Sequence, residues 1–585
     1  MTTTFRGAAA APGVGQGTVF VYLPQEHEFM RPAMRGAAAG YDPHHEWRRF
    51  EEAQRAVEQD LAEMSQVLNT VAVDIFNVHQ LILNDQTLTG AVRDAIHLNQ
   101  SDAAVATYQA IHDMAELFRA MDDEYFASRA ADILDIGRRL LVKLGVAMDE
   151  VRLEELPEGA VLLAEDLTPS DVAHLASSAV VGVALAGSTP TAHSAILARS
   201  LGLPVVCGLG PEILEARPGV AAIVDGGKGV LLLDPDAATQ ARYGEILRVQ
   251  EDQRHQAYDH AHEPAVTRSG ERIPVYANIN SPDDAAHVRH IGADGIGLLR
   301  TEYLFQGRPE PPTVAEQARV YRHLLTEMNH RVLTVRALDA GGDKPVEFLL
   351  GLPEANPFLG KRGMRLLLAN PDLLRDQYLA LAQVVHARRG HTPVRFMLPM
   401  VSTAEEVAAA RAIIDAAHGE VFGTPRRRDE IALGVLVEVP AAALIARHLA
   451  EMVDYFSIGT NDLAQYVMAG DRTNPQVAHL ADPLQPAVLH LIRLVCRAAQ
   501  ERELPVSVCG EVAGNVQAVP LLLGLGVTEL SAPAPSVPLI KQAVRTWHMA
   551  ECRDLAELTL RCATAERVHM LLDRTLPAGQ RDVKP

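Results

Sequence analysis

The chain has 585 residues, 48% of them hydrophobic and 22% charged, which is typical of a globular protein with more than one domain. Its formal net charge of −21 argues against nucleic acid or an anionic membrane surface as the main partner. No apolar stretch approaches the roughly 18 residues of a membrane span, Met1–Ala11 lacks the apolar core of a signal peptide, and five cysteines without paired spacing indicate free thiols. We therefore expect a cytoplasmic protein without membrane insertion.

The chain begins with a predicted strand, followed by a helical block. Gly17–Leu23 is rich in β-branched and aromatic residues and follows a Pro-Gly turn, which favours a strand. Residues 25–148 are predicted to form helices, because apolar residues recur there at spacings of three, four and seven. Gly145 is a plausible C-cap for the last helix. The first stripe consists of Trp47, Phe50, Val57, Leu61, Met64 and Leu68, and further helices are expected at Val71–Leu83, Asp102–Met121 and Asp122–Leu144.

From Ala160 onward, the sequence pattern changes to short predicted strands between turns and short helices. Because one strand precedes the helical block, we expect a β/α domain of residues 1–24 and 149–233 with residues 25–148 inserted into it. Residues 234–264 are polar and helical, which suits an exposed linker and a hinge. The expected strands are Val161–Leu163, Val180–Ala184, Val205–Cys207, Ala221–Val224 and Val230–Leu233.

Residues 265–585 contain eight short apolar runs separated mostly by helical patterns, which predicts a (β/α)8 barrel. The fold class is therefore α/β multidomain. Most runs end in a polar residue, and the C-terminal strand ends of such a barrel gather at one mouth, where active sites lie. The runs are Ile273–Ile279, Gly295–Leu299, Val332–Val335, Phe396–Met400, Leu433–Val437, Tyr455–Ile458, Val506–Val508 and Thr528–Leu530.

Arginines follow the second and third runs. Arg300 and Arg336 present forks of donors that match phosphate or carboxylate oxygens, although a structural ion pair at the barrel rim is an equal alternative for either one. Arg362 and Arg365 add positive charge after the third run and could equally stabilise their own loop. The arginines together indicate a site for a phosphorylated small molecule.

Carboxylates follow the neighbouring runs. Glu438 and Asp462 suit Mg²⁺, which binds one or two carboxylates together with substrate oxygens. The alternative is a network of carboxylate–arginine salt bridges without metal. Asn461 can donate to a phosphate oxygen, and Arg472 follows in Gly-Asp-Arg.

A single thiol, Cys509, follows the seventh run, in Val-Cys-Gly-Glu. A lone cysteine on a strand is usually buried filler. Beside an anion site at a barrel mouth, however, general acid chemistry is the better interpretation.

In the first half of the chain, Gly187–Arg199 runs from a turn into a predicted helix and carries His193 near the helix N-terminus. The helix dipole favours a nearby phosphate and a neutral, nucleophilic imidazole. Thr191 and Thr168 could supply further donors. A capping or core histidine is the alternative.

Several long motifs in order resemble Enzyme I of the sugar phosphotransferase system, the phosphoenolpyruvate–protein phosphotransferases. The resemblance covers nearly the whole chain. Its motifs are Asp-Leu-Thr-Pro-Ser, Thr-x-His with Ile-Leu-Ala-Arg-Ser-Leu-Gly-Leu-Pro, Arg-Thr-Glu-Tyr-Leu-Phe, Gly-Gly-Asp-Lys, Asn-Pro-Phe-Leu-Gly, Glu-Val-Pro-Ala-Ala-Ala, Ser-Ile-Gly-Thr-Asn-Asp-Leu and Cys-Gly-Glu-Val-Ala-Gly.

The resemblance implies a role for each matching residue. His193 would accept the phosphoryl group on Nε2, and Cys509 would protonate enolpyruvate. Glu438 and Asp462 would bind Mg²⁺. The helical block would dock the histidine phosphocarrier protein, and two copies would pair through their barrels. The residues that match phosphoenolpyruvate ligands are Arg300, Arg336, Asn461, Asp462 and Arg472.

One loop departs from the family pattern. The family usually shows Gly-Gly-x-Thr-Ser-His, whereas this chain has Gly187-Ser188-Thr189-Pro190 before Thr191, with one residue more and a stiffening proline. We expect this loop to affect transfer rate or carrier choice. The rival interpretations are a pyruvate–phosphate dikinase or phosphoenolpyruvate synthase, whose ATP-binding module has no counterpart here, and a non-catalytic relative, which the complete barrel set argues against.

Overall fold

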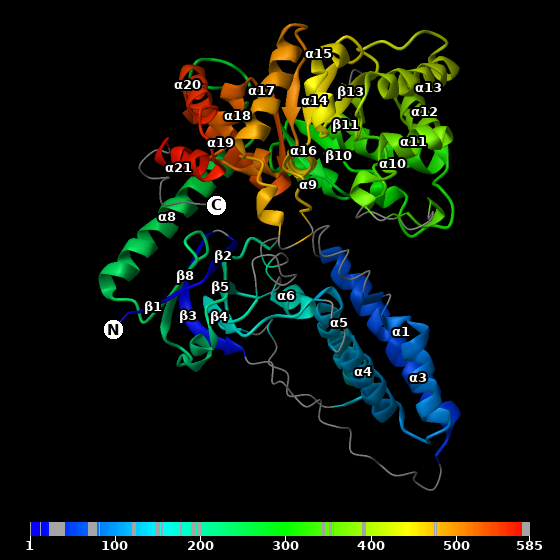
Figure 1. Ribbon diagram of the computed structural model, residues 1–585, viewed down its shortest axis with the longest axis vertical. Helices are drawn as coiled ribbons and strands as arrows, with labels where there is room; N and C mark the ends of the chain where they lie inside the picture. Colours follow the sequence, from blue (N-terminus) through cyan, green and yellow to red (C-terminus); the bar gives the residue numbers. More distant parts are fainter. Residues whose placement is uncertain are drawn as a thin grey trace. The chain divides into compact units, whose positions relative to one another are not determined.

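The computed structural model describes two compact units, Met1–Val249 and Gln250–Arg581 (Figure 1). Each is considered by itself below. The described residues are 2–11, 13–22, 41–67, 79–80, 82–119, 124–146, 153, 156–175, 178–188, 195, 198, 201–341, 346–349, 354, 356–388, 393–472, 474 and 477–575.

The first unit contains a mixed sheet in the order β1-β8-β7-β3-β4-β5-β6-β2. Strands β3, β4, β5 and β6 run parallel, and the flanking pairs are antiparallel. β3 pairs with β4 although 137 residues separate them (Tyr22 to Ala160), which places the intervening helices between two adjacent strands. The strands are β1 Thr3–Arg6, β2 Ala8–Ala11, β3 Val14–Tyr22, β4 Ala160–Ala164, β5 Val180–Leu185, β6 Val205–Cys207, β7 Ala221–Asp225 and β8 Val230–Leu233.

The helices of this unit agree with the apolar periodicity. Phe50, Val57 and Leu61 of the predicted stripe are fully buried. Gly145 adopts a positive φ of 86°, as a C-cap glycine does, and Val146 N–H donates to Leu141 O just beyond α5. Most of the predicted helix Val71–Leu83 lies outside the described residues. The helices are α1 Pro43–Val67, α3 Gln86–His97, α4 Ala103–Arg119, α5 Glu124–Lys143 and α6 Pro169–Leu175. A further helix, α8 Ala237–Asp259, begins in this unit and ends in the next.

The second unit is built on a closed barrel of eight parallel strands, as the alternating apolar runs predict. Seven of the eight strands match the expected runs to within two residues, although β12 begins and ends two residues early. The exception is β16, which extends three residues beyond the expected end at Leu530, to Pro533. The strands are β9 Val275–Ile279, β10 Gly295–Leu299, β11 Val332–Arg336, β12 Val394–Leu398, β13 Ala432–Val437, β14 Tyr455–Ile458, β15 Val506–Val508 and β16 Glu529–Pro533.

Helices of this unit follow or connect the strands. α10 and α13 both begin with a Thr–Glu capping box, Thr313–Glu316 and Thr403–Glu406, which satisfies their first free N–H groups. The helices are α9 Asp284–His290, α10 Val314–Met328, α11 Met364–Ala369, α12 Pro371–Ala387, α13 Ala404–Phe422, α14 Pro440–Leu444, α15 Ala446–Leu449, α16 Thr460–Met468, α17 Pro486–Gln500, α18 Val519–Leu525, α19 Val537–Thr546, α20 Met549–Thr559 and α21 Ala565–Thr575.

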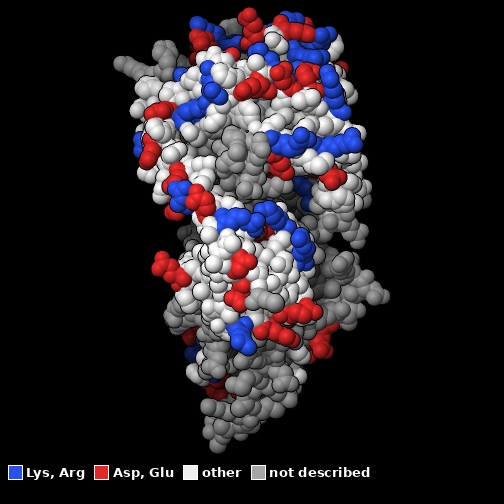
Figure 2. Space-filling model, turned by 90° about the vertical axis from the view of Figure 1, so that its left-hand side faces the viewer, with Lys and Arg blue, Asp and Glu red and all other residues white. Residues whose placement is uncertain are grey.

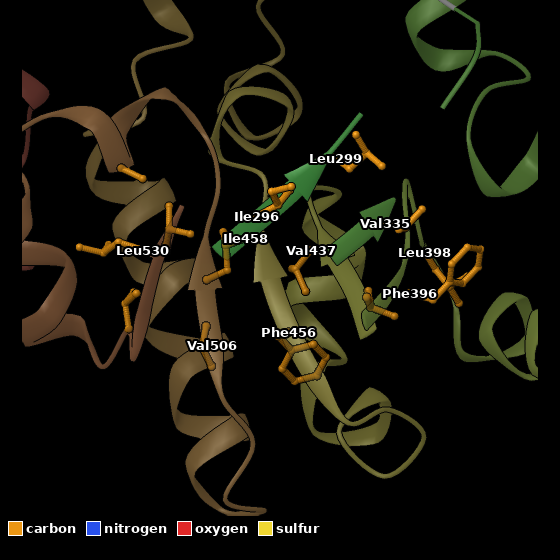
Figure 3. Close-up of a cluster of buried hydrophobic side chains, with 14 of the residues drawn as sticks. Ile296, Leu299, Val335, Phe396, Leu398, Val437, Phe456, Ile458, Val506 and Leu530 are labelled. Carbon is orange, nitrogen blue, oxygen red and sulfur yellow. The ribbon is translucent and has the colours of Figure 1, made fainter. Parts of the chain in front are cut away.

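The two faces of several barrel strands contribute to two separate cores. Val437, Phe456 and Val506 belong to a large apolar cluster that also includes helix residues (Figure 3). Their neighbours Leu436 and Tyr455 belong to a small cluster with Cys509. Successive side chains of a strand point to opposite faces, so the first cluster joins the barrel to its helices and the second lies inside it.

The interior near the N-terminal strand ends is polar. Arg395, near the start of β12, makes two hydrogen bonds of 2.6 and 2.8 Å to Glu529 at the start of β16. Three strands lie between β12 and β16 in either direction around the closed barrel, so this ion pair crosses the barrel. Tyr455 and Tyr276 lie against the guanidinium, with ring centroids 5.0 and 5.7 Å away. This ion pair forms the floor of the barrel, opposite the strand ends at which Arg300 and Arg336 lie.

On the face of the molecule drawn in Figure 2, Lys and Arg side chains lie among Asp and Glu side chains. The net charge of −21 is therefore not gathered into one acidic patch on that face. Among the residues that the structure describes, no helix is long and apolar enough to span a membrane.

Candidate active site at the barrel mouth

The barrel brings the predicted polar residues together because its strands end at the same level. Leu299 is paired with Val335, so Arg300 and Arg336 follow at neighbouring strand ends. Val437 is paired with Ile458, and Ile458 with Val508, which places Glu438, Gly459 and Cys509 at the same rim. The residues therefore share one mouth, as the strand-end pattern predicts.

Arg336 is almost fully buried and is held by carboxylates. Its Nη2 donates to Glu302, and its Nη1 lies 3.4 Å from Asp339 Oδ2. Burial opposes the charge of the guanidinium, but Glu302 and Asp339 raise the pKa of Arg336 above its usual value. Arg336 is thus a fixed cation whose carboxylate partners orient it.

Arg300 has a different environment. Its Nη1 donates to Asn280 Oδ1 at 3.2 Å, and no carboxylate of the described residues forms an ion pair with it. Burial and the neighbouring charge of Arg336 lower the pKa of Arg300. A half-buried arginine beside a second arginine, with an amide and no carboxylate bonded to it among the described residues, is electrostatically suited to an anion supplied from outside the chain.

Arg362 is the residue whose importance the sequence underestimates. It is fully buried, bonds to Asp339 through Nη2 at 2.9 Å and reaches Asp462 Oδ1 through Nη1 at 3.2 Å. Arg365, by contrast, is exposed and donates to Leu359 O and Gly360 O, so it stabilises its own loop. Arg362 therefore lies among the carboxylates at the barrel mouth, whereas Arg365 is bonded within its own loop.

The carboxylates lie among these arginines. Asp462 contacts Arg362 through Oδ1 and Arg472 through Oδ2, the latter at 3.3 Å. Glu438 accepts the Met400 N–H through Oε1 at 2.7 Å. A network of carboxylate–arginine contacts, the alternative to a metal site, is therefore present around Asp462. It does not extend to Glu438, which has no ion pair with the described residues.

The donor set nevertheless fits a magnesium ion. Burial and the nearby carboxylates of Asp462 and Asp339 raise the pKa of Glu438 to about 8, so a divalent cation would relieve repulsion there. The Oε2 atom of Glu438 accepts no hydrogen bond from the described residues. No group of three or more His, Cys, Asp or Glu side chains suited to a metal occurs in the described ranges.

Asn461 is hydrogen-bonded to Glu511, in the segment that follows Cys509. Asn461 Oδ1 accepts Glu511 N–H at 3.0 Å and its Nδ2 donates to Glu511 Oε1 at 3.2 Å, which ties the start of α16 to the segment that follows Cys509. Asn461 thus bonds to the chain itself here. Gly510 permits this approach, because a Cβ atom at that position would lie 1.8 Å from Thr460 Oγ1.

Cys509 is buried and faces the barrel interior. Ser457 Oγ donates to its sulfur at 3.3 Å, and Ser507 Oγ donates to Ser457 Oγ at 2.9 Å. Burial raises the pKa of the Cys509 thiol to about 11. The group is therefore protonated at neutral pH, as a proton donor must be.

Three of the predicted site residues belong to the first unit, and the structure describes one of them. His193 and Thr191 lie outside the described residues, and their roles stay predictions. Thr168 is placed: its N–H donates to Asp171 Oδ2 at 2.9 Å, and Tyr22 donates to Asp171 Oδ1 at 2.9 Å. Ser188, in the loop that departs from the family pattern, adopts a positive φ of 64°.

Three family models match consecutive parts of the chain. They describe a PEP-utilising enzyme's N-terminal region at residues 6–129, its mobile domain at residues 156–229 and its PEP-binding domain at residues 254–549. Their order agrees with the order of elements along the chain.

Curated relatives match over most of the chain. A phosphoenolpyruvate-protein phosphotransferase of Bacillus sp. (strain S) is 38% identical, over 90% of this chain and 91% of its own length. One of Geobacillus stearothermophilus is 39% identical, over 86% of both chains. A multiphosphoryl transfer protein of Rhodobacter capsulatus is 38% identical over 97% of this chain, which spans 67% of that longer protein. The chain therefore belongs to the Enzyme I family of phosphoenolpyruvate–protein phosphotransferases, within the PEP-utilising enzymes.

Proposed function

We propose that the barrel mouth binds phosphoenolpyruvate and that His193 receives its phosphoryl group and passes it to a histidine phosphocarrier protein. The observation that carries the proposal is the convergence of Arg300, Arg336, Arg472 and Glu438 with Cys509 at one barrel mouth, in a chain of this family. Arginines there match the phosphate and carboxylate oxygens of the substrate.

The chain's own residues then have distinct tasks. Arg300, Arg336 and Arg472 bind and orient the anion, with Asn461 and Asp462 completing the substrate site. His193 Nε2 forms a bond to phosphorus in line with the breaking P–O bond, and that electron pair remains on the enolate oxygen. The Cys509 thiol gives its proton to the enolate carbon, which yields pyruvate, and the thiolate is reprotonated from solvent.

Glu438 and Asp462 are the proposed ligands of Mg²⁺, which when bound neutralises charge on the transferring phosphoryl group. The support is the acidic, buried environment of Glu438 described above. The pairing of Asp462 with two arginines fits a ligand held ready in one orientation.

The remaining organisation is proposed with the same function. We assign residues 1–24 and 149–233 to the phosphohistidine domain, 25–148 to the carrier-docking insertion, 234–264 to the linker and 265–585 to the barrel. α8 lies within the linker and supports its helical part. Pairing of two copies through the barrel and a cytoplasmic location complete the proposal, and the five free cysteines agree with a reducing compartment.

The test is transfer of label from [³²P]phosphoenolpyruvate to the protein. Label on His193 that depends on Mg²⁺, with one pyruvate released per label, is the expected result. Equal labelling of His193→Ala would contradict the proposal. Supplying ATP with pyruvate in place of phosphoenolpyruvate separates this function from that of a dikinase or synthase, which would use the nucleotide.

A further inference from the structure

Gln377, on α12, connects the ends of the two strands that carry Arg300 and Arg336. Its side chain is fully buried. Oε1 accepts the N–H of Leu338 at 2.9 Å, and Nε2 donates to Thr301 Oγ1 at 3.0 Å and to Arg336 O at 3.3 Å. One amide therefore contacts the residue after Arg300, Arg336 itself and the segment that follows it.

Thr301 completes this connection. Its hydroxyl donates to Arg336 O at 3.0 Å, so the two strand ends are joined both directly and through Gln377. The backbone register between β10 and β11 shifts between Ile296 and Leu299. Because an irregular register disrupts the ladder locally, side-chain hydrogen bonds take on part of the task of aligning these two ends.

We propose that Gln377 is a positioning residue that holds the backbones of Arg300 and Arg336 in register and so sets the affinity of the site for phosphoenolpyruvate. The inference rests on the proposed function, in which both arginines bind the substrate. Gln377 contacts no reacting atom in this account; it acts through the two strand ends.

The chemistry of the amide suits this task. A neutral amide supplies one acceptor and two donors, whereas a charged residue would alter the balance of an arginine-rich site. A displacement of about 1 Å in a binding group is enough to lower activity on the order of 100-fold. Loss of the Gln377 hydrogen bonds is thus expected to weaken substrate binding although both arginine side chains are retained.

Gln377→Met removes these three hydrogen bonds, and a fourth of 3.4 Å from Nε2 to the Tyr321 hydroxyl, at similar volume. The adjacent Tyr378→Phe is the matched control, because Tyr378 is also fully buried on α12 but pairs with His418 Nδ1 at 3.0 Å, away from the strand ends. Both are measured in a His193→Ala background, where phosphoenolpyruvate binds without turnover, by calorimetry with Mg²⁺. Gln377→Met should raise Kd about 10-fold or more, and Tyr378→Phe should leave it within about twofold.

In the protein with His193 intact, phosphotransfer from phosphorylated His193 to the carrier does not use the barrel site, so Gln377→Met should leave that step at the parent rate. Thr301→Val is the second variant if Gln377→Met fails to fold, and it should raise Kd in the same direction because it loses the direct bond to Arg336 O. An unchanged Kd in the folded variants, or an equal rise with Tyr378→Phe, overturns the inference. Absence of phosphoenolpyruvate binding by the His193→Ala parent would instead overturn the proposed function.

Discussion

Replacement of Arg300 by methionine separates substrate binding from stability. Arg300 is half-buried beside Arg336, with Asn280 as its hydrogen-bond partner and no carboxylate partner among the described residues. In the free protein this guanidinium is therefore an incompletely neutralised charge. The electrostatic energy of this charge becomes favourable when an anion binds beside the guanidinium.

The expected loss of activity follows from the bonds that the guanidinium can form. Each hydrogen bond between charged groups contributes about 1.5–3 kcal/mol, and a two-pronged contact therefore about 3–6 kcal/mol. Arg300→Met should lower kcat/KM for phosphoenolpyruvate on the order of 10²- to 10⁴-fold.

Stability should respond in the opposite sense. Removing a half-buried like charge beside Arg336 costs no ion pair with the described residues, so the free Arg300→Met protein should unfold at the same temperature as the parent or higher. Arg336→Met is the contrasting variant, because Arg336 is bonded to Glu302 and Asp339. Removal of one partner from a buried ion pair costs about 3–5 kcal/mol.

Steady-state kinetics of the variant with His193 intact measures the loss of kcat/KM. Calorimetric unfolding with and without phosphoenolpyruvate and Mg²⁺, in a His193→Ala background, measures stability and substrate binding. Ligand at about 100 times its Kd stabilises the parent by roughly 2.7 kcal/mol, and Arg300→Met at the same concentration should show almost none of this. A free Arg300→Met protein that is destabilised as much as Arg336→Met, or one that keeps the full ligand effect, refutes the reasoning.

Two further predictions concern the proton donor and the barrel floor. Cys509→Ala should slow pyruvate formation while label still reaches His193. Because burial raises the pKa of the thiol to about 11, ionisation of Cys509 should not lower the parent rate between about pH 6 and 9. A loss of rate in that range that disappears in Cys509→Ala would contradict this assignment. Glu529→Leu removes one partner of the ion pair with Arg395 and should destabilise the barrel unit by about 3–5 kcal/mol, or about 4–7 °C for a unit of this size. The KM for phosphoenolpyruvate should stay unchanged, and a changed KM would show that the floor and the mouth are coupled. The double variant with Arg395→Met should recover part of the lost stability.

The prediction of the barrel from sequence succeeded because its strands are buried on both faces. Runs such as Gly295–Leu299 and Leu433–Val437 are apolar over their whole length, and each ends at a charged residue, which marks both the strand and the mouth. β1 and β2 were not predicted. Ala8–Ala11 has little intrinsic preference for a strand and is one because it pairs with β6, about 200 residues away in sequence. The same non-local pairing, with β8, accounts for β1.

For the barrel, the sequence by itself determined the succession of strands along the chain and the polar residue at most strand ends, because apolar runs alternate there with polar segments. Tertiary structure alone decided which of those side chains meet. Arg362 lies 100 residues before Asp462, and Glu529 lies 134 residues after Arg395, yet each pair is in contact. Closing the barrel sets these distances, and no local pattern records them, so the ion pairs that distinguish Arg300 from Arg336 appear only in the folded protein.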